Sequence, residues 1–159
     1  MNNLSVTISE GYKRSFQDFI RRTRALSDGM NEEQFWSKPF PFGNSFGHLV
    51  LHITGNLNFY IGAQISSNGY VRNRELEFTD SVPPSKEEAL LRLEESVALV
   101  IAALEQQTDE DWATSYSAIG VEEKDRYGIF LRCAVHFHHH IGQMIYLKKA
   151  YDSRSSDRA

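Results

Sequence analysis

The chain has 159 residues, of which 41% are hydrophobic and 24% are charged, a composition typical of one globular domain and not of a disordered or fibrous protein. The formal net charge of -4 provides no basic field to attract a phosphate backbone, which argues against nucleic acid as the main partner. No stretch approaches the ~18 consecutive apolar residues that a membrane span requires, so we expect no transmembrane segment.

The number of cysteines and the amino-terminal sequence indicate the cellular compartment. The chain contains a single cysteine, Cys133, so no intramolecular disulfide can form. The amino-terminal sequence has no apolar segment of the kind that a secretory signal peptide contains. We therefore expect a cytoplasmic protein.

Two long helices are predicted in the first half of the chain. Apolar residues recur at helical spacing over residues 9–26, and Gly29 follows where this pattern ends. A second helical pattern covers residues 45–65 after a proline-containing connection, and Asn44 and Ser45 are its candidate N-caps.

Two more long helices are predicted in the second half. Residues 85–107 begin with the capping pattern of Ser85 and Glu88 and continue in helical register, and residues 129–151 form the last apolar helical segment. The connection over residues 66–85, about twenty residues long, exceeds what a helix hairpin needs. It suits a crossover between helix ends that are not adjacent.

These elements predict the fold class. Four long amphipathic helices without an alternating strand indicate an all-α four-helix bundle, with a long crossover between the second and third helices. We expect residues 1–151 to form this single domain and residues 152–159, rich in Ser, Asp and Arg, to form a disordered tail.

The histidines are the most informative residues of the chain, because all six lie in two short segments. His136 and His140 are four residues apart, so they share one helix face, and the helical period puts them on the inward stripe. His138 falls on the opposite side. Two buried neutral imidazoles need partners for their nitrogens, and a divalent cation would satisfy both.

A third ligand separates a metal site from ordinary buried histidines, which often only form hydrogen bonds. The second helix offers His48 and His52 beside its core face, and either residue could complete a site. Three histidines with no fourth protein ligand leave an open position for water or substrate, as in catalytic zinc sites. Nickel, cobalt or iron would suit imidazoles as well.

Two further residues share the inward stripe of the last helix. Cys133 is either a fourth ligand or a small core residue, and we favour the core residue. Gln143 either hydrogen-bonds a water on the metal or packs at the rim of the site. No Glu-x-x-His pattern precedes His136 or His140, and no His-Glu-x-x-His occurs, so neither a di-iron bundle nor a zincin-type protease is supported.

Two motifs carry a resemblance to a known family. "NSFGHLVLHITGNLNFYI" and "HFHHHIGQMIYLKKAY" resemble the DinB-like (DinB/YfiT) superfamily, in a branch that is a domain of unknown function. The branch pattern matches Asn44 through His52 to Asn56 and His136 to Gln143, and the linker "RNRELEF" is also similar. The resemblance implies the four-helix bundle, with His52, His136 and His140 as three metal ligands; the branch does not reserve the position of His48 for histidine.

The resemblance also implies a class of chemistry. The metal in such proteins is usually zinc or nickel with solvent at the open position, and members with known roles include transferases and isomerases that use small thiols such as bacillithiol or mycothiol. A dication stabilises thiolate over thiol, so either water or a thiol is the expected nucleophile. This implies a metal-dependent enzyme of S-transferase or hydrolase type acting on a small-molecule substrate.

The sequence alone leaves two alternatives to a metal-dependent enzyme. A non-catalytic, metal-binding homodimeric bundle with a role in stress response is one, and histidines satisfied by hydrogen bonds without any ion are another. We expect a homodimer, and Gly55 and Gly62 would permit close helix approach within the bundle or across the dimer. Arg72 and Arg74 of the linker are candidate anion-binding residues, although we favour solvated loop charges.

Overall fold

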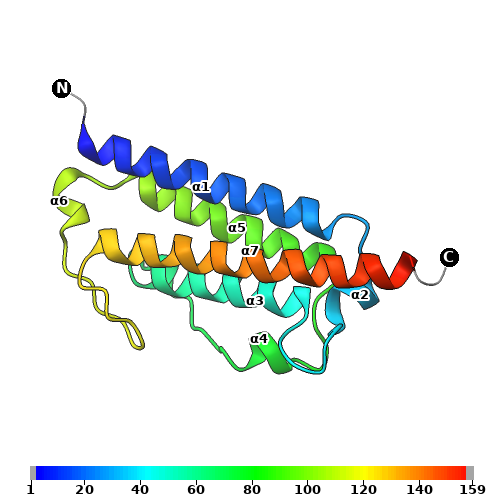
Figure 1. The fold of residues 1–159 in the computed structure, drawn as a ribbon. Coiled ribbons are helices and arrows are strands. Elements are labelled where there is room, and N and C mark those ends of the chain that lie inside the picture. Colours follow the sequence, from blue (N-terminus) through cyan, green and yellow to red (C-terminus); the bar gives the residue numbers. More distant parts are fainter. Residues whose placement is uncertain (1–2, 157–159) are drawn as a thin grey trace.

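The structure, a computed structural model, describes residues 3–156. Its long elements are α1, α3 with the π-helix η1 that continues it, α5 and α7, and three short helices lie in the connections (Figure 1). The bounds are α1 Leu4–Ser27, α2 Glu32–Trp36, α3 Phe46–Leu57, η1 Asn58–Ala63, α4 Leu76–Thr79, α5 Lys86–Glu105, α6 Asp109–Trp112 and α7 Arg126–Ser156. Within residues 3–156 the single β-type pairing is the isolated bridge between Ser115 and Asp125.

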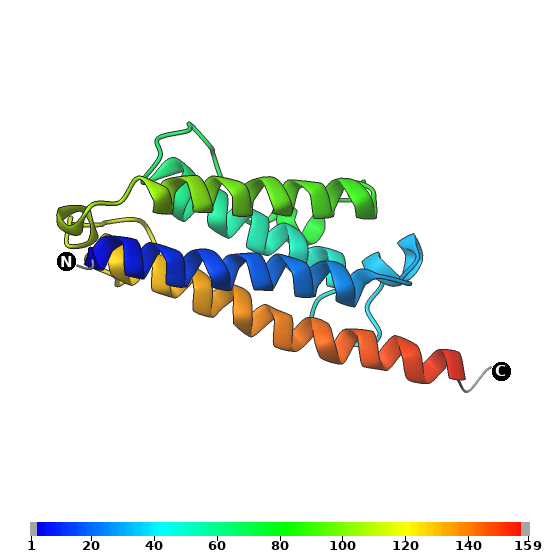
Figure 2. The same ribbon diagram turned by 90° about the horizontal axis from the view of Figure 1, so that it is seen from above.

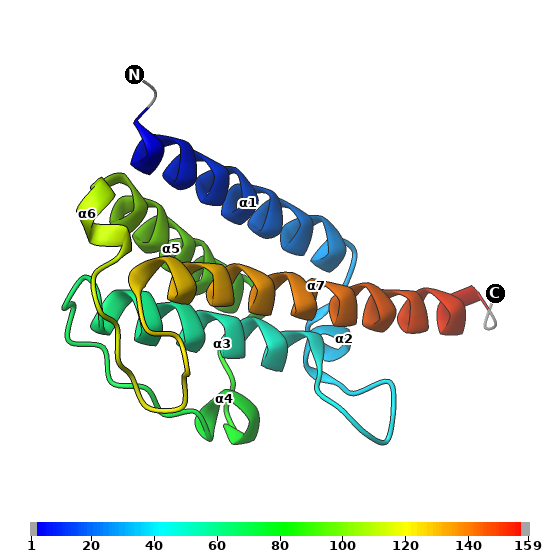
Figure 3. The ribbon, with the colours of Figure 1, turned by 60° about the vertical axis from the view of Figure 1, so that its left-hand side comes forward.

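The four long elements form the predicted all-α four-helix bundle. Each long helix packs against two others: α1 against α5 and α7, and α3 against α5 and α7. In Figure 1, α1 and α7 run in one direction, whereas α3 and α5 both run in the other. Because α3 and α5 are parallel, the chain must cross the length of the bundle between them, and Figure 3 shows this crossover with α4 beside α3.

Local capping explains where the helices begin. The side chain of Asn3 accepts hydrogen bonds from the first turn of α1, and Ser85 accepts one from the Glu88 backbone N–H at the start of α5. Ser45 caps α3 by accepting from the His48 backbone N–H, as its sequence position predicted. This cap therefore fixes the start of α3 one turn before His48.

The expected bounds of three long helices differ from the structure, and α1 begins at Leu4 although its start was expected at residue 9. The second helix was expected as one α-helix over 45–65, but its last part is the π-helix η1, a wider turn in which backbone bonds reach five residues back. The disordered tail was expected from residue 152, but α7 continues through residue 156 and projects past the other helices (Figure 2). An ion pair one turn apart, between Lys148 and Asp152, supports this last stretch. Residues 157–159 lie outside the described part.

The core lies between the four long elements and contains many aromatic rings. Its largest fully buried side chains are Phe16, Phe35, Phe46, Phe130, Phe137, Ile53, Leu57, Ile61, Leu90, Leu93, Leu104 and Ile129. They come from α1, α2, α3, η1, α5 and α7, so one shared core holds the bundle together. Within residues 3–156 no helix is both long and apolar enough to cross a membrane.

The buried ring of Phe137 makes the packing testable. It is 0% exposed and contacts the rings of Phe16 and Phe19, with centroids 6.5 Å and 5.4 Å away. Phe137→Ala is expected to lower the free energy of unfolding by ~3–5 kcal/mol, measured by urea denaturation. The matched control Phe42→Ala, at a ring that is 74% exposed, should change it by no more than ~0.5 kcal/mol. Equal losses in the two variants would contradict this packing.

Candidate metal centre

Three imidazoles from two helices converge in the bundle. The Nε2 atom of His136 lies 3.1 Å from the Nε2 atom of His52 and 3.1 Å from that of His140. One ligand atom from each of the three rings lies within 4.8 Å of the other two. His52 is only 8% exposed, and the other two rings are half-buried. The structure thus brings together the three residues that were expected as ligands.

The backbone explains this convergence. His136 and His140 are one turn apart on α7, so their rings point to the same side of that helix. Helix α3 packs antiparallel to α7 and places the ring of His52 at equal distances from the rings of His136 and His140, with centroid separations of 5.0 Å and 5.1 Å. The site therefore depends on the register between α3 and α7.

The outer nitrogen of His52, the Nδ1 atom that points away from the cluster, has a hydrogen-bond partner in the crossover. The Nδ1–H of His52 donates to Glu77 Oε2 over 2.7 Å, and Glu77 is only 7% exposed. Arg72 holds the same carboxylate with two donors, Nε at 2.7 Å from Oε1 and Nη2 at 2.9 Å from Oε2. A histidine that donates Nδ1–H outward presents the lone pair of its Nε2 inward, which is the form that a metal binds.

Gly55 allows Glu77 to approach α3 this closely. A Cβ atom at residue 55 would lie 2.1 Å from Glu77 Oε1 and 2.9 Å from its Cδ, so any larger residue would displace the carboxylate. Gly62 likewise faces Asn68 and Leu99, with its Cβ position 2.6 Å from Asn68 Nδ2. Both glycines thus accommodate contacts within the chain.

The outer nitrogen of His140 also has a partner. The Nδ1–H of His140 donates to Gln143 Oε1 over 2.7 Å, and Gln143 Nε2 lies 3.2 Å from His139 Nε2. Gln143 therefore orients a candidate ligand directly, a role that the sequence-level alternatives for this residue did not include. Like His52, His140 presents its Nε2 lone pair toward the centre.

Burial keeps the imidazoles of His136 and His140 uncharged. Burial, together with the neighbouring His140 and His52, lowers the pKa of His136 from 6.5 to about 3. Burial lowers the pKa of His140 to about 4, although the hydrogen bond to Gln143 acts in the opposite direction. Both rings are neutral at pH 7, which leaves their nitrogen lone pairs available as ligands.

The spacing of the three nitrogens fits one divalent cation. With metal–nitrogen bonds of ~2.1 Å, two ligand nitrogens are about 3.4 Å apart in a tetrahedral site and about 3.0 Å apart in an octahedral site. The observed 3.1 Å separations lie between these values. An all-imidazole set suits zinc, nickel, cobalt or iron and leaves at least one position for another ligand.

Other residues that the sequence singled out lie elsewhere. The ring of His48 closes the cap of α3, with Nδ1 2.9 Å from Ser45 Oγ, and His138 stacks on Phe19. Cys133 is a buried core residue outside the histidine cluster, and burial raises its pKa to about 12, so its thiol stays protonated.

The expectation that both linker arginines are solvated loop charges was wrong for Arg72. Its side chain is only 10% exposed and pairs with Glu77, whereas Arg74 lies over the ring of Phe78, 5.6 Å from the centroid. Neither Glu77 nor its pairing with His52 was expected from the sequence, because helical periodicity carries no information about a contact made by a crossover. The string "RNRELEF" was the one signal that included both Arg72 and Glu77.

Two cavities adjoin the triad and share His139 as a lining residue. One, of about 540 Å³, includes His136 in its wall together with Glu123, Arg132 and Val135. The other, of about 510 Å³, is an aromatic groove lined mainly by Phe40, Phe42, Leu49, Gln143, Tyr146 and Leu147. A ligand in the first cavity would lie next to His136, whereas the groove reaches Gln143, the partner of His140, but is lined by none of the three histidines.

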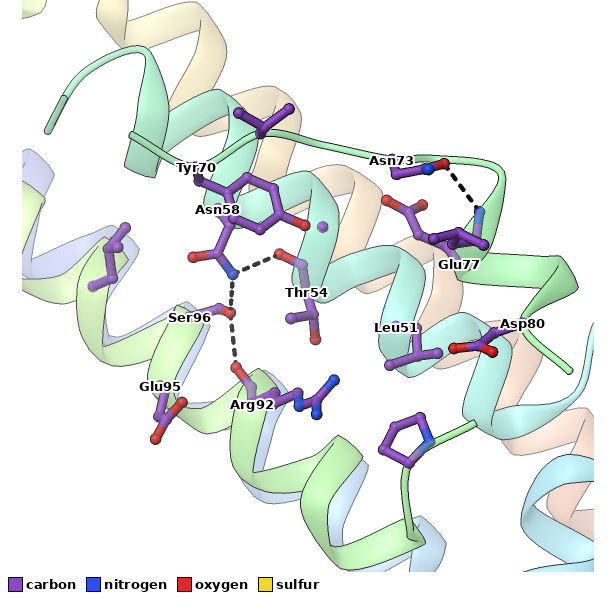
Figure 4. A pocket seen from close by; sticks show the side chains of 15 residues that line it. Leu51, Thr54, Asn58, Tyr70, Asn73, Glu77, Asp80, Arg92, Glu95 and Ser96 are labelled. Carbon is purple, nitrogen blue, oxygen red and sulfur yellow. Dashed lines mark hydrogen bonds between the residues drawn. The ribbon is translucent and has the colours of Figure 1, made fainter. Parts of the chain in front are cut away.

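A third cavity lies between α3, α5 and the crossover. It has a volume of about 530 Å³, and Glu77 forms part of its wall, as Figure 4 shows. Some of its polar groups pair with one another, since Asn58 Nδ2 donates to Ser96 Oγ over 2.6 Å and to the Thr54 carbonyl over 3.0 Å. None of the three histidines lines it.

The fold and the site together define a class of protein, a helical bundle with a three-histidine cluster between two antiparallel helices. Residues 15–144 match the sequence model of the DinB superfamily, and the chain belongs to that superfamily.

Two solved structures share the fold. A conserved protein from Enterococcus faecalis is 16% identical, with 89% of this chain and 95% of that chain covered and a TM-score of 0.73. A DinB-like protein from Bacillus cereus ATCC 10987 is 19% identical, with 90% and 92% covered and a TM-score of 0.68. At these identities the similarity shows the fold alone. No functionally curated protein matches the sequence significantly.

The lowered histidine pKa values predict a pH dependence of stability. In the metal-free protein, His136 and His140 take up protons near pH 3 and 4 when folded but near 6.5 when unfolded. The unfolded chain binds more protons in this window, so the free energy of unfolding should fall as the pH decreases from 6.5 toward 4 and 3. Urea denaturation at stepwise pH checks this. His136→Gln should make the decline shallower, and an unchanged slope would refute the assignment.

Proposed function

We propose that this protein is a metal-dependent enzyme in which His52, His136 and His140 hold one divalent cation, zinc or nickel. The observation that carries the proposal is the convergence of the three imidazoles: His136 Nε2 lies 3.1 Å from the Nε2 atoms of both His52 and His140, whose outer nitrogens bond to Glu77 and Gln143. Burial of neutral rings supports it further, because a ring that resists protonation competes well for a cation.

The chemistry follows from the open coordination position. A bound dication would lower the pKa of a water or of a small thiol there and so supply a nucleophile near neutral pH. Glu77 and Arg72 keep the ring of His52 in one orientation, and Gln143 does the same for His140. We propose hydrolase or S-transferase chemistry on a small electrophilic substrate.

The aromatic groove supports a small-molecule substrate. Phe40 and Phe42 stack with ring centroids 5.7 Å apart and planes 11° apart, and Tyr146 also lines the groove. These rings would hold an apolar part of the substrate, while Gln143 and His139 mark the side that adjoins the triad. The reacting group of the substrate would then face the open position.

A non-catalytic, metal-binding homodimer is the second candidate. The exposed apolar side chains of Leu131, Val135 and Tyr146 on α7 favour it, because such residues on one helix are typical of a surface that another chain covers. A homodimer is also compatible with the enzyme proposal. Cytoplasmic location forms part of both proposals, since a single buried cysteine suits a reducing compartment.

Zinc binding tests the metal proposal. Chelator-treated protein titrated against a chromophoric chelator should take up one zinc ion per chain. His52→Ala should weaken zinc binding by more than ~100-fold, since loss of an outer partner alone costs ~10–100-fold. His138→Ala, at the ring that stacks on Phe19 outside the cluster, is the matched control and should bind zinc normally. Equal zinc affinity in wild type and His52→Ala would contradict the proposal.

Turnover distinguishes the enzyme from the non-catalytic bundle. The zinc- and nickel-loaded proteins are assayed against a panel of small electrophiles, with and without low-molecular-weight thiols. Wild type should exceed His52→Ala by at least ~100-fold for a productive pair, because a metal ion contributes several kcal/mol to such reactions. Equal rates in both proteins would remove the enzyme proposal. Tight metal binding without turnover, together with a dimer in sedimentation equilibrium, would support the second candidate.

A further inference from the structure

Two buried polar atoms lack a hydrogen-bond partner among the side chains that the structure describes, and both bear on the triad. One is Nδ1 of His136, the histidine whose Nε2 contacts both of the others. The other is Oδ1 of Asn56, a residue of α3 that is only 5% exposed. Buried polar atoms are nearly always paired, so two such atoms on facing helices require an explanation.

The helix geometry places these two residues at neighbouring levels. Asn56 follows His52 by four residues, so both lie on the same face of α3. Asn58 is rotated by about 200° from Asn56 and bonds to Ser96 of α5. Asn56 is rotated by only about 40° from His52, whose ring contacts His136 of α7, so helical spacing puts Asn56 on the α7 side of α3. Because α3 and α7 are antiparallel (Figure 1), the step from His52 to Asn56 along α3 leads toward the start of α7, so Asn56 lies on the His136 side of His52 and away from His140.

The hydrogen bonds of the triad determine what His136 needs. His52 and His140 donate their Nδ1–H groups to Glu77 and Gln143, so both present bare Nε2 atoms inward. Without a cation, Nε2–H of His136 is the donor that these two atoms can accept, and its Nδ1 is then a bare acceptor. With a cation, all three Nε2 atoms must be bare, so the proton of His136 belongs on Nδ1.

We propose that Asn56 is the positioning residue for His136 and completes the outer set of partners formed by Glu77 and Gln143. The Asn56 carbonyl accepts the Nδ1–H of His136 in the metal-loaded protein, directly or through one water. Its NH₂ group can instead donate to bare Nδ1 in the metal-free protein. Loading moves one proton from Nε2 to Nδ1 of His136 through solvent, with no net proton change, and an amide serves both forms because it contains a donor and an acceptor.

This inference rests on the proposed metal site, and it predicts specific losses. Asn56→Leu removes both polar groups at similar size, so it should weaken zinc affinity by ~10-fold or more, the usual cost of losing an outer partner. Asn56→Asp keeps an acceptor for Nδ1–H and should bind zinc within ~3-fold of wild type, well inside that cost. The matched control is Asn58→Leu, the same substitution on the α5 side, which should leave zinc affinity unchanged.

The ring signals of His136 separate positioning from stability. In zinc-loaded wild type, ¹H–¹⁵N spectra should show a slowly exchanging Nδ1–H for His136, assigned by comparison with His136→Gln. That resonance should shift and exchange faster in Asn56→Leu, persist in Asn56→Asp and stay unchanged in Asn58→Leu. Unchanged affinity and resonance in Asn56→Leu would overturn the proposal, as would their loss in folded Asn56→Asp or equal effects in Asn58→Leu.

If the three histidines bind no metal, the same variants give a different result. Wild type that binds no zinc would contradict the proposed function, and Asn56 would then be tested in the metal-free protein. There the ¹⁵N shift of bare Nδ1 of His136 should change in Asn56→Leu and not in Asn58→Leu. An identical shift in wild type and Asn56→Leu would overturn the role of Asn56 independently.

Discussion

The antiparallel packing of α3 against α7 is the constraint on which the site depends. It sets the register that brings His52 to the His136–His140 pair, so that His136 Nε2 lies 3.1 Å from the Nε2 atoms of both His52 and His140. A shift of one residue between these helices would move His52 by ~1.5 Å along the axis and turn it by ~100°, which would separate the nitrogens. The shared core, to which both helices contribute buried side chains, holds this register.

The topology of the bundle supplies the outer partners. Because α3 and α5 are parallel, the crossover must pass along α3, and it brings Arg72 and Glu77 over His52. Burying an ion pair of this kind costs desolvation energy and is weak evidence for stability. Its clearer effect is on His52, whose Nδ1–H it fixes outward and whose Nε2 lone pair it directs inward. The long connection thus orients a candidate ligand in addition to joining two helices.

Much of the fold and part of the site could be predicted from the sequence, for identifiable reasons. The spacing of His136 and His140 is local to one helix, so periodicity alone placed them on the inward stripe. Periodicity could not choose between His48 and His52, because both flank the core face and tertiary packing decides. Contacts of Glu77 were inaccessible because it lies in a crossover without a regular period, and the continuation of α7 beyond residue 151 was missed because its polar composition resembles a disordered tail.

X-ray absorption at the zinc edge of the zinc-loaded protein, in a thiol-free buffer, tests the shared histidine site most directly. The site predicts three imidazole nitrogens at ~2.0–2.1 Å around the ion and no sulfur neighbour, since Cys133 is buried outside the cluster with its thiol protonated. A sulfur neighbour near ~2.3 Å, or a spectrum with fewer than three imidazoles, would contradict the account.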